Sequence, residues 1–244
     1  MGDQQQSEFE ALLLRKEDRV GVSLLLIIAW ISASGGEIDK QASDDLRKVA
    51  AAGRHCAYLP LIIELAKEGN SAALQLACEC IQQRCRGSRA TLMMELVIGV
   101  SNTGRELPPA TNHILRFLSD LLSISQTALI SLYDEAAGRK LPGPSDVSGQ
   151  EYWQKRPRSR RAKEHAPHPT QLNQVEDLPK EVDPNKIIGV PYEASKAEIK
   201  IAFKKLAQIH IPSRYKALGD EAVAAAAITQ ERIQNAYRTR LRHA

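Results

Sequence analysis

Residues 195–213 have the sequence SKAEIKIAFKKLAQIHIPS, which predicts one amphipathic helix followed by a proline turn. Ser195 and Glu198 have the spacing of a capping box, in which each side chain accepts a hydrogen bond from the other residue's backbone N–H. Pro212 ends the helix, because proline disfavours helical geometry at the residue before it. The apolar residues fall on one stripe, which is the face expected to pack: Ile199, Ala202, Phe203, Leu206 and Ile209.

Two further helices are predicted around this one. Asp183-Pro184 followed by Gly189 indicates a single helical turn that begins with an aspartate cap and closes at glycine. A second long helix starts near Asp220 and carries apolar residues as far as Leu241. Together these elements predict an antiparallel hairpin whose open end is filled by the short turn.

The hairpin resembles a J domain over about residues 183–241. The resemblance is carried by three motifs in order, which are Ile187-Ile188-Gly189-Val190, Ala202-Phe203-Lys204-Lys205-Leu206-Ala207 and Ile233-Gln234-Asn235-Ala236-Tyr237. In J domains the basic second helix docks on a DnaK-type, ATP-driven chaperone. The resemblance therefore implies docking through Lys200, Lys204 and Lys205.

The loop that triggers ATP hydrolysis in J domains departs from the family. Where the family has His-Pro-Asp, this chain has Ile211-Pro212-Ser213. An isoleucine side chain neither donates nor accepts hydrogen bonds, and serine lacks the negative charge of aspartate. His210 lies one position before the family's histidine, where an aromatic residue usually packs on the hairpin. We expect a structural role for His210 and keep a triggering role as the alternative.

The N-terminal half predicts six to eight helices between Ser7 and Ala137, ending at Gly138. Helices of this length with short connections pack antiparallel around one core. The apolar run from Val20 to Ile31 is too short to span a bilayer and is predicted as a buried core helix. Short joints interrupt the helical pattern at Gly35-Gly36, Ala52-Gly53, Gly69-Asn70, Arg86-Gly87 and Thr103-Gly104.

An internal repeat relates residues 24–50 to residues 93–119, 69 positions later. In each copy an apolar helix runs into a glycine turn and then into a second amphipathic helix. Leu46 and Val49 of the first copy match Leu115 and Leu118 of the second. We interpret this as a duplicated helix-turn-helix unit, with chance similarity of two helix pairs as the alternative.

This arrangement resembles the TerB-like domain of the tellurite-resistance family over roughly residues 10–137. A TerB-like domain followed by a J domain is the order found in DjlA-type membrane-anchored co-chaperones, here without the anchor. The family's turns carry acidic residues linked to metal binding, whereas the turns here leave only Glu37, Asp39 and Glu106 nearby. Hard cations need several oxygen ligands that converge, so we expect no metal and no cofactor.

Helical periodicity is lost between the two segments. The predicted organisation is a TerB-like domain at residues 8–138, a flexible basic linker at 139–181 and a J-like domain at 182–244, all in an all-α chain. The linker's cations stand beside Tyr152 and Trp153, and they are Lys155, Arg156, Arg158, Arg160, Arg161 and Lys163. Such a tract binds RNA phosphates, lies on an anionic membrane surface, or serves only as a solvated tether.

Composition narrows the class of protein. A net charge of +4 does not by itself indicate nucleic-acid binding. Four cysteines and a polar start without a secretory signal favour a reducing compartment, so we expect a cytoplasmic protein, with contact at the inner membrane as an alternative. The sequence has no glycine-rich phosphate loop and no dinucleotide fingerprint, and we predict no catalytic residues and no enzyme.

Three functions follow from these observations. The first is a co-chaperone whose J-like domain docks a DnaK-type chaperone while the TerB-like domain binds a client or partner. The second is a degenerate J-like adaptor that does not stimulate the chaperone's ATPase. The third and weaker one is an adaptor that binds RNA or a membrane surface through the basic linker.

Overall fold

The computed structural model describes residues 2–15, 19–144 and 182–243, in which helices are joined by short connections and no strand occurs. The prediction of an all-α fold is confirmed. The N-terminal bundle (residues 2–137) consists of α1 (Gly2–Arg15), α2 (Arg19–Ser34), α3 (Lys40–Ala52), η1 (Cys56–Tyr58), α4 (Leu59–Glu68), α5 (Ser71–Arg84), α6 (Ser88–Ser101), α7 (Pro109–Leu121) and α8 (Gln126–Ala137). The C-terminal hairpin (residues 184–243) consists of α10 (Pro184–Ile188), α11 (Lys196–Ile209), η3 (Pro212–Leu218) and α12 (Asp220–His243).

The repeat offset of 69 positions is present in the helix boundaries. α2 and α6 begin 69 positions apart, and α3 and α7 both begin and end at that offset. The two non-glycine residues with positive φ among the described residues, Arg54 and Ser123, are also related by it. The equivalence extends to Gly69 and Gly138, which close α4 and α8 in left-handed geometry. The duplicated unit therefore covers three helices.

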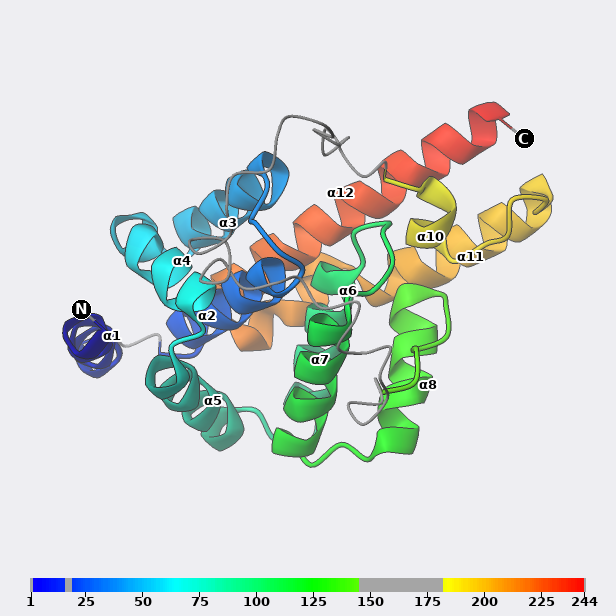
Figure 1. The fold of residues 1–244 in the computed structure, drawn as a ribbon. Coiled ribbons are helices and arrows are strands. Elements are labelled where there is room, and N and C mark those ends of the chain that lie inside the picture. Colours follow the sequence, from blue (N-terminus) through cyan, green and yellow to red (C-terminus); the bar gives the residue numbers. More distant parts are fainter. Residues whose placement is uncertain (1, 16–18, 145–181, 244) are drawn as a thin grey trace, which may run out of the picture. The chain divides into compact units, whose positions relative to one another are not determined.

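The apolar run from Val20 to Ile31 lies inside α2, as predicted. Its side chains from Val22 to Ala29 are almost completely buried. α2 contacts α3, α4, α5, α6, α7 and α12, so it is the central helix of the bundle (Figure 1). No helix within the described ranges is long and apolar enough to cross a membrane.

The predicted caps of the C-terminal hairpin are present. Asp183 accepts a hydrogen bond from the Asn185 backbone N–H at 2.8 Å, and Gly189 closes α10 with φ of 76°. The capping box of α11 is complete, because Ser195 accepts from the Glu198 N–H and Glu198 accepts from the Ser195 N–H. Local sequence signals thus set both ends of α10 and the start of α11.

α12 belongs to two hydrophobic cores. Its first half contributes Ala222, Ala225 and Ala226 to the core of the N-terminal bundle, together with Tyr215 and Leu218 of η3. Its second half contributes Ile233 and Ala236 to a smaller core with α10 and α11. Figure 1 shows α12 running from beside α3 and α6 to α10 and α11. The described residues up to Pro142 and from Val182 onward therefore form one compact unit.

A buried acid at the start of α12 fixes this helix against the bundle. His55 Nε2 lies 2.6 Å from Glu221 Oε1, and both side chains are almost fully inaccessible. A methyl group on Gly21 or on Gly53 would overlap the Glu221 carboxylate. The two glycines therefore provide the space that the carboxylate occupies.

Candidate functional site

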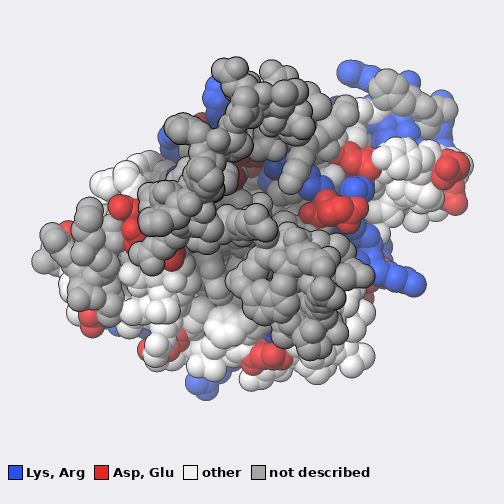
Figure 2. All heavy atoms as spheres, in the orientation of Figure 1, with Lys and Arg blue, Asp and Glu red and all other residues white. Residues whose placement is uncertain are grey.

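The basic face of the hairpin lies on α11. Lys200, Lys204 and Lys205, the residues predicted to dock a chaperone, are all exposed to solvent. Figure 2 shows Lys and Arg side chains along the edge where α11 and the C-terminal part of α12 lie. α11 packs on α8, α10 and α12, and the three lysines lie outside these contacts on its exposed surface.

The loop after α11 is only partly open. Ile211 is 38% exposed and Ser213 is exposed, whereas Pro212 is half-buried. Pro212 begins η3, a 3-10 helix, where the sequence predicted a proline turn. Two residues of η3, Tyr215 and Leu218, are buried in the core of the N-terminal bundle. The exposed side chains at positions 211 and 213 are therefore an alkyl group and a hydroxyl. The backbone that follows them is held in place by the buried residues of η3.

His210 is buried, and the structure gives it a packing role. Its Nε2 donates a hydrogen bond of 2.8 Å to the Ala136 carbonyl at the end of α8. Burial lowers the pKa of His210, although the Ala136 carbonyl opposes this shift. A neutral, inaccessible imidazole facing α8 cannot act at the exposed loop surface, which fits the structural role expected from the sequence.

Arg214 and Glu95 join the loop to α6. The Arg214 Nη2 lies 3.0 Å from Glu95 Oε2, and the Arg214 Nη1 donates to the Ile209 carbonyl. Burial raises the pKa of Glu95, and Arg214 opposes this shift. The Tyr215 hydroxyl also donates to the Ile209 carbonyl, at 3.1 Å. These contacts hold the loop on the bundle.

The second glycine turn of the bundle contacts α10. The Asn102 side chain donates to the Ile187 carbonyl at 3.0 Å, and the Asp183 N–H donates to the Gly104 carbonyl at 3.1 Å. Glu106 pairs with Lys186 at 2.5 Å, and the hydrogen bond from Lys186 lowers the pKa of Glu106.

Two of the three acids near the turns, Asp39 and Glu106, pair with cations. Asp39, near the first turn, pairs with Arg105 at 3.2 Å, as Glu106 does with Lys186. Among the described residues, no group of three or more His, Cys, Asp or Glu side chains is arranged to hold a metal ion. Two acidic residues at the turns that resemble those of TerB-like domains are thus in ion pairs. The Glu106–Lys186 pair connects the second turn to the hairpin.

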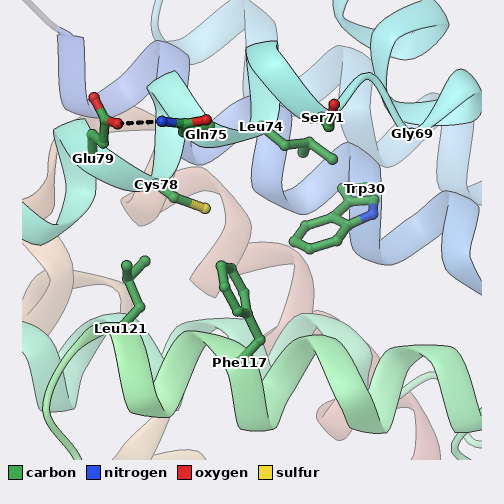
Figure 3. Close-up of a pocket in the computed structure, with 9 residues that line it drawn as sticks. All are labelled: Trp30, Gly69, Ser71, Leu74, Gln75, Cys78, Glu79, Phe117 and Leu121. Atoms are coloured by element: carbon green, nitrogen blue, oxygen red, sulfur yellow. Dashed lines mark hydrogen bonds between the residues drawn. The ribbon is translucent and has the colours of Figure 1, made fainter.

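A second candidate site is an apolar cleft between α5 and α7, with a volume of about 430 Å³ (Figure 3). Its lining includes Trp30 of α2, Leu74 and Cys78 of α5, and Phe117 and Leu121 of α7. The Trp30 and Phe117 rings meet edge to face, with 6.2 Å between centroids. Burial raises the pKa of the Cys78 thiol to about 11, so the thiol is neutral at pH 7 and adds no charge to the cleft.

One carboxylate stands at the edge of this cleft. Glu79 is exposed on α5 and accepts a hydrogen bond from Gln75 at 2.8 Å. No Lys or Arg is among the residues that line the cleft. The cleft therefore combines aromatic and aliphatic walls with a single negative charge.

The sequence did not predict this cleft. Trp30 and Phe117 lie 87 positions apart, and only the packing of α2 and α7 brings their rings together. The internal repeat was the one sequence signal that related these two regions. A duplicated unit predicts that the two helix pairs pack pseudo-symmetrically in one bundle.

The six predicted linker cations, from Lys155 to Lys163, lie outside the described residues. Their binding to RNA or to a membrane stays a prediction. The cysteines carry no zinc-like arrangement among the described residues, and Cys78 and Cys85 are buried free thiols.

Comparison with protein-family models, curated proteins and solved structures finds no match for this chain. The resemblance to J and TerB-like domains accordingly rests on the motifs quoted above.

Proposed function

We propose that this chain is an adaptor of the co-chaperone class, whose J-like hairpin docks a DnaK-type chaperone without triggering ATP hydrolysis. The observation that carries the proposal is the position of His210. It is the one histidine beside the proline loop, and its ring is buried and bonded to Ala136. At the three positions of the trigger motif the surface then offers only Ile211, Pro212 and Ser213, none of which carries an imidazole or a negative charge.

The exposed lysines of α11 support the docking half of the proposal. Three cations on one solvent-facing helix favour encounter with an acidic partner surface, and this attraction weakens as salt rises. The packing of the hairpin on the bundle in one compact unit supports the adaptor half. A partner bound to the bundle would be held at a defined distance from a chaperone bound to α11.

ATPase stimulation tests the triggering claim. The wild-type chain should leave the ATP turnover of a DnaK-type chaperone unchanged, whereas the double variant Ile211→His, Ser213→Asp should raise it. Both substituted side chains replace exposed ones, so the fold should tolerate them. Stimulation by the wild-type chain would contradict the proposal and favour an active co-chaperone.

Docking is tested separately by binding. Charge reversal at Lys200, Lys204 and Lys205 should weaken binding to the chaperone by more than tenfold at low salt. Lys67→Glu is the control for a charge reversal elsewhere, because Lys67 is also exposed but lies on α4. Equal binding by the α11 variant and the control would exclude α11 as the docking helix.

An active co-chaperone is the second candidate, and the intact basic helix is the observation in its favour. RNA or membrane binding through residues 155–163 is the third. Its affinity should fall steeply with salt and with neutralisation of Arg156, Arg158, Arg160 and Arg161. We also propose a cytoplasmic location.

A further inference from the structure

The cleft between α5 and α7 borders the first repeat at Trp30, and the equivalent position of the second repeat receives the C-terminal hairpin. Trp30 of α2 and Gly99 of α6 are equivalent at the repeat offset of 69 positions. A methyl group on Gly99 would lie 2.5 Å from the His210 ring and 3.0 Å from Thr229. The hairpin is therefore seated directly on α6 at the residue that corresponds to Trp30.

The two repeats differ in how completely this position is covered. On the second repeat, α12 contacts both α6 and α3. On the first repeat, α5 packs on α2, but a cleft remains between α5 and α7. α7 is the repeat equivalent of α3, so the first repeat lacks the closure that the hairpin provides on the second.

The glycines that end the third helix of each repeat differ in the same way. Gly138, after α8, lies against the backbone of Ile188 and Gly189 in the hairpin. Gly69, after α4, lines the cleft and has no atom within 4 Å of the place where a Cβ would stand. The glycine that ends the second repeat is therefore covered by the hairpin, whereas the glycine that ends the first repeat is not covered by another element.

From this relationship we propose that the cleft binds one amphipathic helix of a partner protein, which presents large apolar side chains to Trp30 and Phe117 and a lysine or arginine to Glu79. Phe117 is 47% exposed, which is a large apolar surface for a partner to cover. Glu79 is the charged residue of the lining and favours a cation opposite it. The inference deepens the proposed adaptor function, because it identifies the partner surface of the bundle.

Tryptophan fluorescence tests this proposal in the full chain. The chain has two tryptophans, so Trp153→Phe leaves Trp30 in the cleft as the sole reporter. The probe is a synthetic helical peptide with leucines on one face and lysines on the other, and its counterpart carries glutamate in place of lysine. The lysine peptide should change Trp30 emission in a saturable manner and bind at least tenfold more tightly than the glutamate peptide. The chain's net charge of +4 opposes that preference, so it would have to come from the cleft.

Variants make the test specific. Phe117→Asp should weaken binding of the lysine peptide at least tenfold, and Glu79→Lys should reverse the preference between the two peptides. Glu79 is exposed, so its substitution should leave the fold intact. Ile130→Asp is the control, because Ile130 is 48% exposed on α8 and is not among the lining residues.

Three results would overturn the proposal. One is the absence of saturable binding, and another is binding that survives both Phe117→Asp and Glu79→Lys. The third is a concentration-dependent dimer in sedimentation that Phe117→Asp dissociates, which would assign the cleft to a second copy of this chain. No chaperone is present in these experiments, so their failure leaves the claim about the hairpin loop intact, and failure of the ATPase test leaves the cleft intact.

Discussion

Gly138 and Gly189 meet backbone to backbone, each in left-handed geometry at the end of a helix. Their φ angles are 67° and 76°, and a methyl group on Gly189 would overlap the backbone of Gly138. The contact joins the end of α8 to the end of α10. The backbones of the N-terminal bundle and the hairpin are therefore in direct contact at this point, with no side chain between them. Only glycine satisfies both the dihedral angle and the lack of space at these positions.

Substitution of Gly189 should be costly for that double reason. We expect Gly189→Ala to lower the free energy of unfolding by about 3 kcal/mol, from left-handed strain and overpacking together. Gly69→Ala is the matched control, because Gly69 has a φ of 62° with open space around it. That variant should lose only about 1 kcal/mol. Equal losses in chemical denaturation would show that the glycine contact contributes nothing beyond the dihedral angle.

Stability should depend on pH through His210. Its pKa lies below the usual value because of burial, so the unfolded chain takes up the proton first as the pH falls. The contribution of His210 to the free energy of unfolding should therefore be fully present above about pH 6.5 and decrease below it, by up to about 1.4 kcal/mol per pH unit. His210→Phe keeps a ring at this position but cannot titrate. The difference in stability between wild type and His210→Phe should change between pH 7.5 and pH 5.5, and a constant difference would contradict this role.

Arg232 connects α12 to α3 and to the end of α6. Its guanidinium donates to the Asn102 carbonyl at 3.1 Å and pairs with Asp45 at 3.3 Å. Arg232→Met keeps the length of the side chain but leaves these groups unpaired, which should cost about 2–3 kcal/mol. Arg47→Met is the control, because the Arg47–Asp44 pair is well exposed and should contribute less than about 1 kcal/mol. Thermal melts that rank the two variants in the opposite order would exclude Arg232 as a structural link.

The N-terminal bundle should not fold cooperatively without the hairpin. A chain that ends at Pro142 lacks Tyr215, Leu218 and the three alanines that α12 adds to the bundle core. Its exposed apolar surface should broaden or abolish the thermal transition measured by circular dichroism. Addition of a separate 182–244 fragment should restore the transition. A sharp transition for residues 1–142 alone would instead support two independent domains at the predicted boundary.

Local sequence signals determined most of the secondary structure. The Ser195–Glu198 box, the Asp183-Pro184 start and Gly138 each act through groups a few residues away, so their effect can be predicted without the fold. The repeat offset likewise followed from residue order. The helix at Gly2–Arg15 begins earlier than expected, because its polar first turns lack the apolar periodicity on which the prediction relied.

The tertiary structure alone decided how those helices are used. The sequence determined a hairpin, a proline turn at Pro212 and a duplicated helical unit. It did not determine that α12 serves two cores, that His210 is buried beneath α8, or that one repeat is open where the other is covered. The partners in these contacts, such as His55 with Glu221 and Gly99 with His210, are more than a hundred positions apart. Helical periodicity reports which face of a helix is apolar, whereas the choice of the partner that covers it depends on packing of the whole chain.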